Sequence, residues 1–277
     1  MPSEVGYGAN SAARIATKHM GPATQARLDS SRHISSGKKI NSASDNAANV
    51  AIAMSMLSQQ GGVQQAYRNV QEGVAMLQTA ESGYQNMTDV LIRMRELAVQ
   101  ASSDSFATQD RAVMDTEFKD LADELNRMSG STEFNGIPLM SGQAGNAGMV
   151  TFQVGSNASD GISAMLNAQD IDSLGLSGSG VADQAQALTS ISSIDGAIKQ
   201  VAADRAALGS SLNQLGGASE QLSAQYEANA TSLSNVQDAD LGRESSARAS
   251  AGIKEEATIA ILAQANQHSD AVLKLLG

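Results

Sequence analysis

The stretch of the chain that decides its fold is VQQAYRNVQEGVAMLQTAESGYQNMTDVLIRMRELAVQA (63–101), in which apolar residues recur every seven positions. A sustained 3.5-residue apolar period is typical of a helix that packs along one seam against a partner and supercoils to the left. A second set follows three residues later, and its many small residues should let the partner backbone come close. The first set is Val63, Val70, Leu77, Tyr84, Leu91 and Ala98, and the second is Ala66, Gly73, Ala80, Met87, Met94 and Ala101.

A second heptad run predicts a partner helix over residues 183–236. Its first seam set is Ile194, Val201, Leu208, Leu215 and Leu222, with Val236 in phase two heptads later. We assign its other seam to Ile191, Ile198, Leu212, Tyr226 and Leu233, interrupted by Arg205 and Ser219. Because heptads do not identify their own partners, the pairing of the two runs is a hypothesis. The two runs together predict a mainly α fold, a long coiled-coil or helical-bundle rod.

Between the two runs, the sequence predicts a shorter helix and a small β-hairpin region. The helix has an amphipathic face from Met114 to Met128, with Thr108 and Asp110 as plausible caps at its start. Asn135-Gly136 is a turn signal, and the alternation in residues 150–155 is typical of a half-buried strand. We therefore expect strands and loops here, followed by a Gly- and Ser-rich connection at 176–180.

Composition and charge narrow the class of protein. The chain has 277 residues, no Cys, 3% aromatic residues and a formal net charge of -11. Few aromatic residues argue against a thick core, and the negative charge makes non-specific nucleic-acid binding unfavourable. The charge is uneven, because residues 1–40 carry a net +4 and residues 128–198 contain no Lys or Arg.

No catalytic, cofactor or metal site is recognisable in the sequence. Its three His residues form no ligand pair, and neither a GxGxxG, a GxxxxGK[ST] nor a GxSxG motif occurs. Without Cys, disulfides and thiolate metal sites are excluded. No apolar stretch is long enough to span a membrane, and the first residues lack the apolar core of a secretory signal. We expect neither an enzyme nor a cofactor-binding protein.

Several stretches closely resemble bacterial flagellin. The resemblance covers about residues 38–157 and 205–277, in the order in which that family has them. RELAVQ (95–100, within LIRMRELAVQASS at 91–103) is a highly specific element of it. The other matching stretches are ISSGKKINSASDNAANVAIA (34–53), RNVQEGVAMLQTAESG (68–83), LNRMSGSTEFNGIPLM (125–140), FQVGSN (152–157), DADLGRESSA (238–247) and ILAQANQHSDAVLKLLG (261–277).

The resemblance implies a structural subunit of the flagellar filament, paired at its N- and C-termini and lacking the variable outer domains of larger flagellins. It implies a secreted, extracellular chain that the flagellar type III apparatus exports unfolded. Its partners would be other copies of itself, cap and junction proteins, and an export chaperone. The implied division is an inner-tube segment (1–46), an N-terminal core (47–182), a C-terminal core helix (183–236) and a C-terminal inner-tube helix (237–277).

The resemblance also assigns roles to individual residues. The terminal helix residues Leu262, Val272, Leu273 and Leu276 would make intersubunit contacts. Arg93, Leu97 and Glu117 fall on positions of the family that a vertebrate innate immune receptor contacts.

One departure from the family lies near the N-terminus. Residues 1–33 are polar and basic, and Gly21-Pro22 predicts a break in any helix there. Two alternatives stay open, a hook–filament junction protein of the same family and an unrelated cytosolic coiled-coil adaptor.

Overall fold

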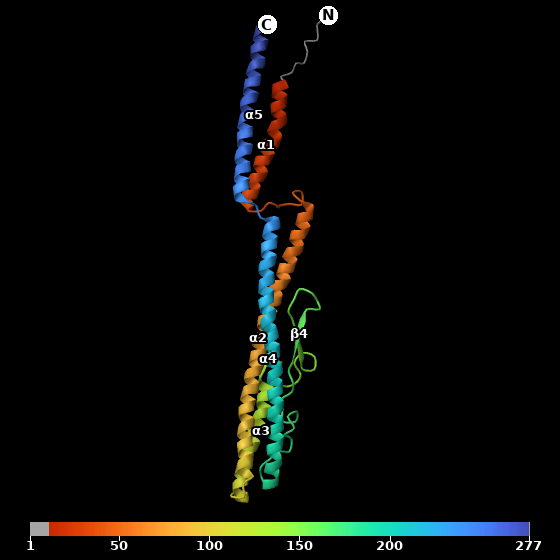
Figure 1. Cartoon of the computed structure of the whole chain (residues 1–277), viewed down its shortest axis with the longest axis vertical. Helices are drawn as coiled ribbons and strands as arrows, with labels where there is room; N and C mark the ends of the chain where they lie inside the picture. The colour runs from red at the N-terminus through yellow and green to blue at the C-terminus, as the bar shows by residue number, and fades with distance from the viewer. Residues whose placement is uncertain (1–10, 277) are drawn as a thin grey trace. The chain divides into compact units, whose positions relative to one another are not determined.

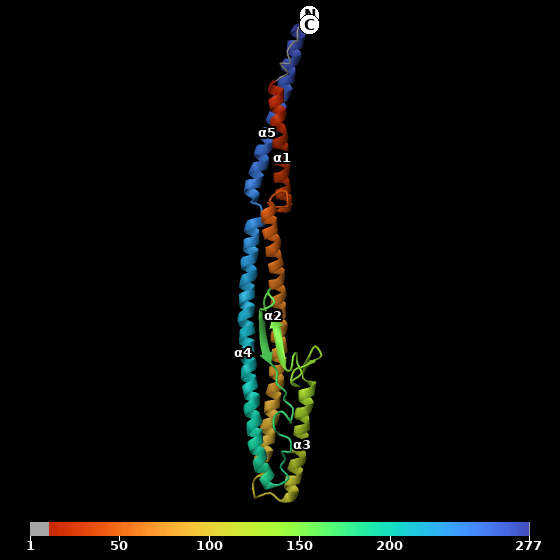
Figure 2. The same cartoon turned by 90° about the vertical axis from the view of Figure 1, so that its right-hand side faces the viewer.

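The computed structural model describes the backbone of residues 11–276 and the side chains of residues 13–267. It is mainly helical, as the heptads predict, with two antiparallel strand pairs between the helices (Figures 1 and 2). The elements are α1 (Ser11–Ser36), α2 (Ala47–Ala101), α3 (Thr108–Ser131), β1 (Glu133–Phe134), β2 (Ile137–Pro138), β3 (Met149–Gln153), β4 (Gly161–Met165), α4 (Gln184–Gln237) and α5 (Leu241–Leu276).

The chain forms two compact units. We call Met1–Ser58 with Asn229–Gly277 the terminal unit, and Gln59–Ala228 the central unit. The long helices α2 and α4 each contribute residues to both units, so the boundary between the units falls within these helices.

In the terminal unit, α1 and α5 run antiparallel and side by side (Figure 1). Small side chains are buried along this pair, among them Ala16 and Ala23 of α1 and Ala251 and Ala265 of α5. Small residues let two helix backbones approach closely. Arg27 Nε also donates a hydrogen bond of 2.7 Å to Glu255 Oε2, which joins the two helices.

The helix break expected at Gly21-Pro22 is wrong, because α1 continues through both residues. Proline removes one backbone hydrogen bond and costs a helix about 3 kcal/mol. Gly21, Pro22 and Lys18, whose carbonyl loses its helical partner, are all exposed, so water can satisfy that carbonyl. Packing of Ala23 and its neighbours against α5 offsets the remaining cost.

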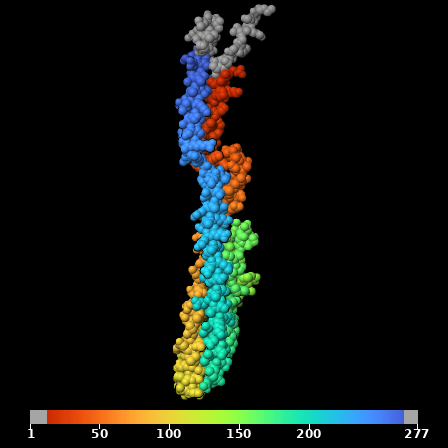
Figure 3. All heavy atoms as spheres, viewed as in Figure 1, coloured from red at the N-terminus to blue at the C-terminus, as the bar shows by residue number. Residues whose placement is uncertain are grey.

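The central unit has one continuous apolar core formed by α2, α3, α4 and the hairpin region. In Figure 3 the atoms around β3 and β4 (green) lie beside those of α4 (cyan). The Asn135-Gly136 turn is confirmed, since both residues have positive φ (52° and 76°) and connect β1 to β2. The expected strand is also confirmed as β3, which pairs with β4 with Phe152 opposite Ile162.

The start of α3 is close to the prediction. Asp110 Oδ2 accepts a hydrogen bond of 3.1 Å from the backbone N–H of Ala107, so Asp110 does stabilise this helix end. Thr108 is the first helical residue and makes no cap, because the cap position is Ala107.

One of the two predicted seams of α4 lies only at the edge of the core. Ile191, Ile198 and Leu212 are only half-buried and Tyr226 is exposed. Small residues on the same helix are more deeply buried: Ser190, and Ala197 and Ser211, which stand three residues after Ile194 and Leu208. The larger residues selected by hydrophobicity pack against the edge of the core, whereas the fully buried positions beside the first seam are small residues.

Candidate assembly interface

In the terminal unit, small apolar side chains are buried and many large ones are exposed, which is the reverse of an ordinary core. Its buried apolar residues are alanines, with Ile40 as the one larger side chain among the described residues. None of the unit's residues whose side chains the structure describes (13–58 and 229–267) belongs to the apolar core cluster, which begins at Val63. Many of its large apolar side chains are exposed instead: Ile15, Leu28, Ile52, Met54, Leu57, Leu241, Ile253, Ile259 and Ile261. A surface of this kind marks an interaction site.

Helix geometry places these exposed side chains on more than one face of the α1–α5 pair. Ala251 of α5 is buried against α1. Ile253 lies two positions further on, about 200° around the helix, and so faces away from α1. It is 68% exposed, as much as any large apolar residue of the described chain.

A shallow groove runs along the α1–α5 pair within the terminal unit. Its lining consists mostly of small side chains, with His19 and Pro22 from α1 and Lys254 from α5. Its volume is about 780 Å³. The terminal unit therefore presents a hollow as well as exposed large apolar side chains.

Polar contacts hold the two terminal helices in place. The Arg27–Glu255 pair is one of them. A second close approach between α1 and α5 brings His33 Nδ1 to 3.3 Å from Glu244 Oε1, but these two atoms form no hydrogen bond. The backbone N–H of Lys39 donates to the carbonyl of Gln237 at 2.7 Å, and that of Ala239 donates to the carbonyl of Gly37 at 2.9 Å. These bonds tie the segments that follow α1 and α4 together.

The four terminal-helix residues expected to make intersubunit contacts lie on α5. Leu262 is half-buried. Val272, Leu273 and Leu276 fall outside the residues whose side chains the structure describes.

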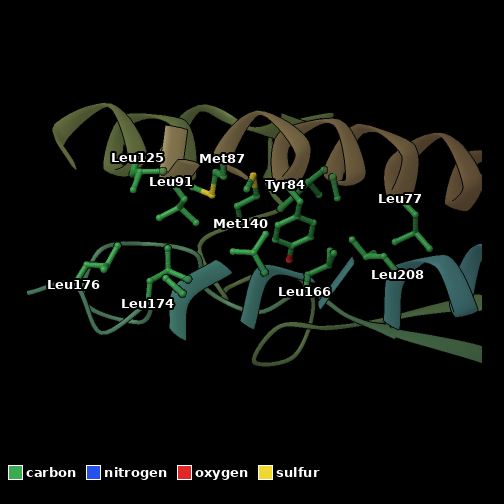
Figure 4. Packing of buried hydrophobic residues seen from close by; sticks show 14 of the residues in the cluster. Leu77, Tyr84, Met87, Leu91, Leu125, Met140, Leu166, Leu174, Leu176 and Leu208 are labelled. Carbon is green, nitrogen blue, oxygen red and sulfur yellow. The ribbon is translucent and has the colours of Figure 1, made fainter. Parts of the chain in front are cut away.

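The ten seam residues named from the first heptad sets of α2 and α4 lie in the core of the central unit, each at most 3% exposed. Figure 4 shows part of this packing, with Tyr84 pointing from α2 toward α4 among Leu77, Leu166 and Leu208. The small residues of α2 do not serve the close helix approach that we expected. Gly73 instead accommodates the ring of Phe152 from β3, and Gly83 accommodates Met140 and Thr132.

A set of polar contacts inside the central unit was not predicted from the sequence. The two residues taken as interruptions of a seam connect α4 to α2: Arg205 binds Glu81 at 2.7 Å, and Ser219 Oγ accepts from Gln71 Nε2 at 3.1 Å. Asp204 accepts from Gln169 Nε2 at 2.6 Å. Interruptions of an apolar pattern were the signal that could have revealed these contacts.

Two buried polar groups in the central unit have perturbed pKa values. Burial raises the pKa of the Tyr84 hydroxyl, and the nearby Asp204 carboxylate raises it further. At Asp115, burial raises the pKa, but Lys119 at 2.7 Å and the Val181 N–H at 2.8 Å lower it by more. The Asp115 carboxylate thus secures the chain at the approach to α4.

Comparison with known proteins accounts for these features. The family model described as the bacterial flagellin N-terminal helical region matches residues 9–145, and that of the bacterial flagellin C-terminal helical region matches residues 191–276. A flagellin of Halalkalibacterium halodurans is 34% identical over 88% of this chain and 89% of its own length. The chain belongs to the bacterial flagellin family.

Other flagellar proteins are similar over half or more of the chain. The flagellar filament 33 kDa core protein of Treponema phagedenis is 31% identical, over 96% of this chain and 98% of its own length. The crystal structure of Bacillus cereus flagellin superposes with a TM-score of 0.50 at 30% identity, covering 56% of this chain and 88% of that one. The protein is accordingly a structural subunit of the flagellar filament, and the family is one of structural proteins.

The three residues at the family's receptor-contact positions lie in the central unit: Arg93, Leu97 and Glu117. Arg93 and Glu117 are exposed and bind each other, with Arg93 Nη2 2.7 Å from Glu117 Oε1. Leu97 is 2% exposed and lies in the core. The structure therefore brings two of the three residues together on the surface, and Leu97 could affect a partner only through the packing beneath.

The described part of this flagellin offers no cluster of three or more His, Cys, Asp or Glu residues that could hold a metal ion. Within the same described residues, no helix is both long enough and apolar enough to cross a membrane.

Proposed function

We propose that this flagellin polymerises mainly through its terminal unit, whose exposed apolar side chains become buried between copies. The observation that carries this proposal is the pairing of an alanine-rich interior with an exposed set of Ile, Leu and Met side chains in that unit. Burying such side chains removes apolar surface from water and supplies the driving force for association.

The two kinds of surface on the terminal unit suit a filament. Helical polymers need a heterologous contact, in which one face of a copy meets a different face of the next. The groove beside His19 and Lys254 and the exposed side chains around Ile253 are such unlike faces. By the family's pattern, Leu262, Val272, Leu273 and Leu276 add to the same interface.

Charge supports the same division of roles. The terminal unit carries ten Lys and Arg and nine Asp and Glu, whereas the central unit carries eight and twenty. A nearly neutral terminal unit can pack against copies of itself with little repulsion, and a central unit of charge -12 is better accommodated where solvent and counterions reach it.

The remaining expectations from the family complete the proposal. The chain would be secreted unfolded by the flagellar type III apparatus, which the absence of Cys favours because no disulfide can lock a folded form. Cap and junction proteins and an export chaperone would be its partners. Its similarity to filament core proteins along nearly their full length favours a filament role over that of a junction protein.

Seeded polymerisation of purified variants tests the proposal. Ile253→Asp and Ile259→Asp place a carboxylate among the exposed apolar side chains of α5, and we expect the critical concentration for assembly to rise more than about tenfold. Leu188→Asp, at an equally exposed apolar position of the central unit, is the matched control and should change it much less. Circular dichroism of each monomer checks that α5 variants remain folded. Normal assembly of both α5 variants would reject the proposal.

A contact with an innate immune receptor is a second proposal, favoured by the exposed Arg93–Glu117 pair. Arg93→Ala and Glu117→Ala would weaken signalling in a receptor reporter assay. If signalling by both variants equals that of the unmodified protein, the receptor contact inferred from the flagellin family is rejected.

A further inference from the structure

The heptad repeats of α2 and α4 leave the alignment of the two helices ambiguous. On α2, seam residues recur every seven positions from Val63 to Leu91, and on α4 from Ile194 to Leu222. A shift of one helix by seven residues moves it about 10 Å along the other and again places apolar side chains opposite apolar side chains. Apolar packing alone therefore discriminates poorly between the native register and one shifted by a heptad.

One position of α4 breaks the repeat. The buried small residues Ser190, Ala197 and Ser211 are spaced by seven and fourteen, and the missing member of that series is Asp204. In a repeat of small uncharged residues, a single carboxylate is the feature that distinguishes one register from the next.

The partners of Asp204 come from one short segment after β4. Gln169 Nε2 donates to Asp204 Oδ2 at 2.6 Å, and Asn167 Nδ2 donates to Asp204 Oδ1 at 2.7 Å. Gln169 is fully buried, and its own backbone N–H donates to the carbonyl of Met140 at 2.8 Å. The amide that meets Asp204 is thus fixed in position by a chain segment that does not belong to either long helix.

A contact with α2 follows one residue further along α4. Arg205 Nη2 and Nε lie 2.7 and 3.0 Å from Glu81 Oε1. Tyr84, one turn from Glu81, is buried next to Gln169 and Asp204. Residues from α2, α4 and the segment after β4 therefore meet in one partly buried polar layer beside the apolar core.

We propose that this layer, formed by Asp204, Gln169, Tyr84 and the Glu81–Arg205 pair, selects the native register of α4 against α2. A seven-residue shift would bring Ala197 or Ser211 to Gln169 and would place the Asp204 carboxylate against apolar side chains. In that register the buried Gln169 amide would have no acceptor, at a large desolvation cost, and the half-buried Asp204 carboxylate would lose both amide donors, so the shifted register is disfavoured. The Asp204 and Gln169 side chains act as positioning residues for the subunit fold.

Stability and register, measured in the same set of variants, distinguish register selection from ordinary stabilisation. Asp204→Ala alone leaves the buried Gln169 amide without an acceptor, and we expect lower stability. The triple variant Tyr84→Phe, Gln169→Leu, Asp204→Ala keeps only the partly exposed Glu81–Arg205 pair of the layer, makes the buried remainder apolar, and should recover stability. It should at the same time lose its single register. Ser211→Ala is the matched control, since Ser211 Oγ bonds the carbonyl of Ala207 in its own helix.

The register can be read directly because the chain contains no Cys. In the full chain, Gln71→Cys with Ser219→Cys reports the native register, since these two side chains are hydrogen-bonded. Gln78→Cys or Gln64→Cys with Ser219→Cys reports a shift of one heptad in either direction. A bifunctional thiol reagent shorter than the shift of about 10 Å distinguishes the pairs.

In the parent and in the Ser211→Ala control, we expect cross-linking of the native pair alone. In the triple variant, we expect the shifted pairs to cross-link about tenfold or more above the parent. If the triple variant cross-links only the native pair, the loops set the register and the proposal is overturned. If the triple variant does not fold, cross-linking of the single variants Asp204→Asn and Asp204→Ala tests the proposal instead. Asp204→Asn should keep the native cross-link alone, whereas equal shifted cross-linking by both substitutions would overturn the proposal.

Discussion

The ring of Phe152 on β3 occupies the space that a side chain at position 73 of α2 would need. A Cβ at Gly73 would lie 2.8 Å from Phe152 Cδ1 and 3.0 Å from Cγ and Cε1. Glycine in a helix interior costs about 1 kcal/mol relative to alanine. The packing of the β3–β4 hairpin against α2 therefore depends on a residue that is unfavourable for the helix itself.

The first prediction concerns this contact. Gly73→Ala should lower the free energy of unfolding by about 1–2 kcal/mol, because overpacking outweighs the gain in helix propensity. Chemical denaturation of the monomer measures it. Gly216→Ala on α4 is the control, since nothing beyond its own stretch of helix backbone lies within 4 Å of its Cβ position, and it should stabilise by up to about 1 kcal/mol. Equal stabilisation by both substitutions would show that Phe152 does not restrict position 73.

The second prediction concerns Asp115 and pH. Its carboxylate bonds Lys119 and the Val181 N–H, and its folded-state pKa lies below that of an ordinary Asp. The stability it contributes is therefore present above about pH 4 and is lost as the pH falls through the lowered value. Asp115→Asn should destabilise by about 1–3 kcal/mol at pH 7. This difference should shrink in acid.

Denaturation curves of Asp115→Asn and the parent between pH 7 and pH 2 provide the measurement. Asp120→Asn, at an exposed position of the same helix, should have little effect at any pH. A difference for Asp115→Asn that does not change with pH would contradict the ionic account of this contact.

The third prediction separates stability from recognition at the receptor positions. Arg93 and Glu117 form an exposed ion pair, so their substitution by alanine should cost no more than about 1 kcal/mol. Leu97→Ala removes a fully packed side chain and should cost about 2–5 kcal/mol. Thermal unfolding measures all three variants. A Leu97→Ala protein as stable as the parent would show that the core around this residue repacks without loss.

The fourth prediction concerns salt. Each copy carries a central unit with a formal charge of -12, and copies come close together in a filament. Screening lengths fall from about 30 Å at 0.01 M salt to about 10 Å at 0.1 M. Seeded elongation should therefore become faster over this range of salt concentration. Slower elongation at higher salt would mean that attractive charge pairs between copies dominate.

Much of the fold could be predicted from the sequence, because a long seven-residue period survives wherever large side chains point to one partner. Val63 to Leu91 and Ile194 to Leu222 lie where this period places them. The second face of α4 could not be found in the same way. Ser190 and Ser211 carry no hydrophobic signal and Ala197 only a weak one, and their burial follows from the space that their neighbours leave.

Contacts that depend on distant segments were also beyond the sequence. Asp204 and Gln169 meet although 35 residues separate them. The course of α1 through Pro22 depends on α5, which lies more than 200 residues further along the chain. Local propensity predicted a break, and tertiary packing decided otherwise. The candidate interface was predictable only through the resemblance to flagellin, because exposure of Ile253 or Leu28 cannot be read from hydrophobicity.

The central claim is that the terminal unit's exposed apolar side chains form the contacts of the polymer. A cryo-electron microscopy reconstruction of filaments assembled from this protein tests it most directly, through the solvent exposure of Leu28, Ile253 and Ile259 in the assembled state. We predict that these side chains, each 47–68% exposed in the monomer, are buried against neighbouring copies. Filaments in which they still face solvent, with copies held together by the central unit alone, would contradict the account.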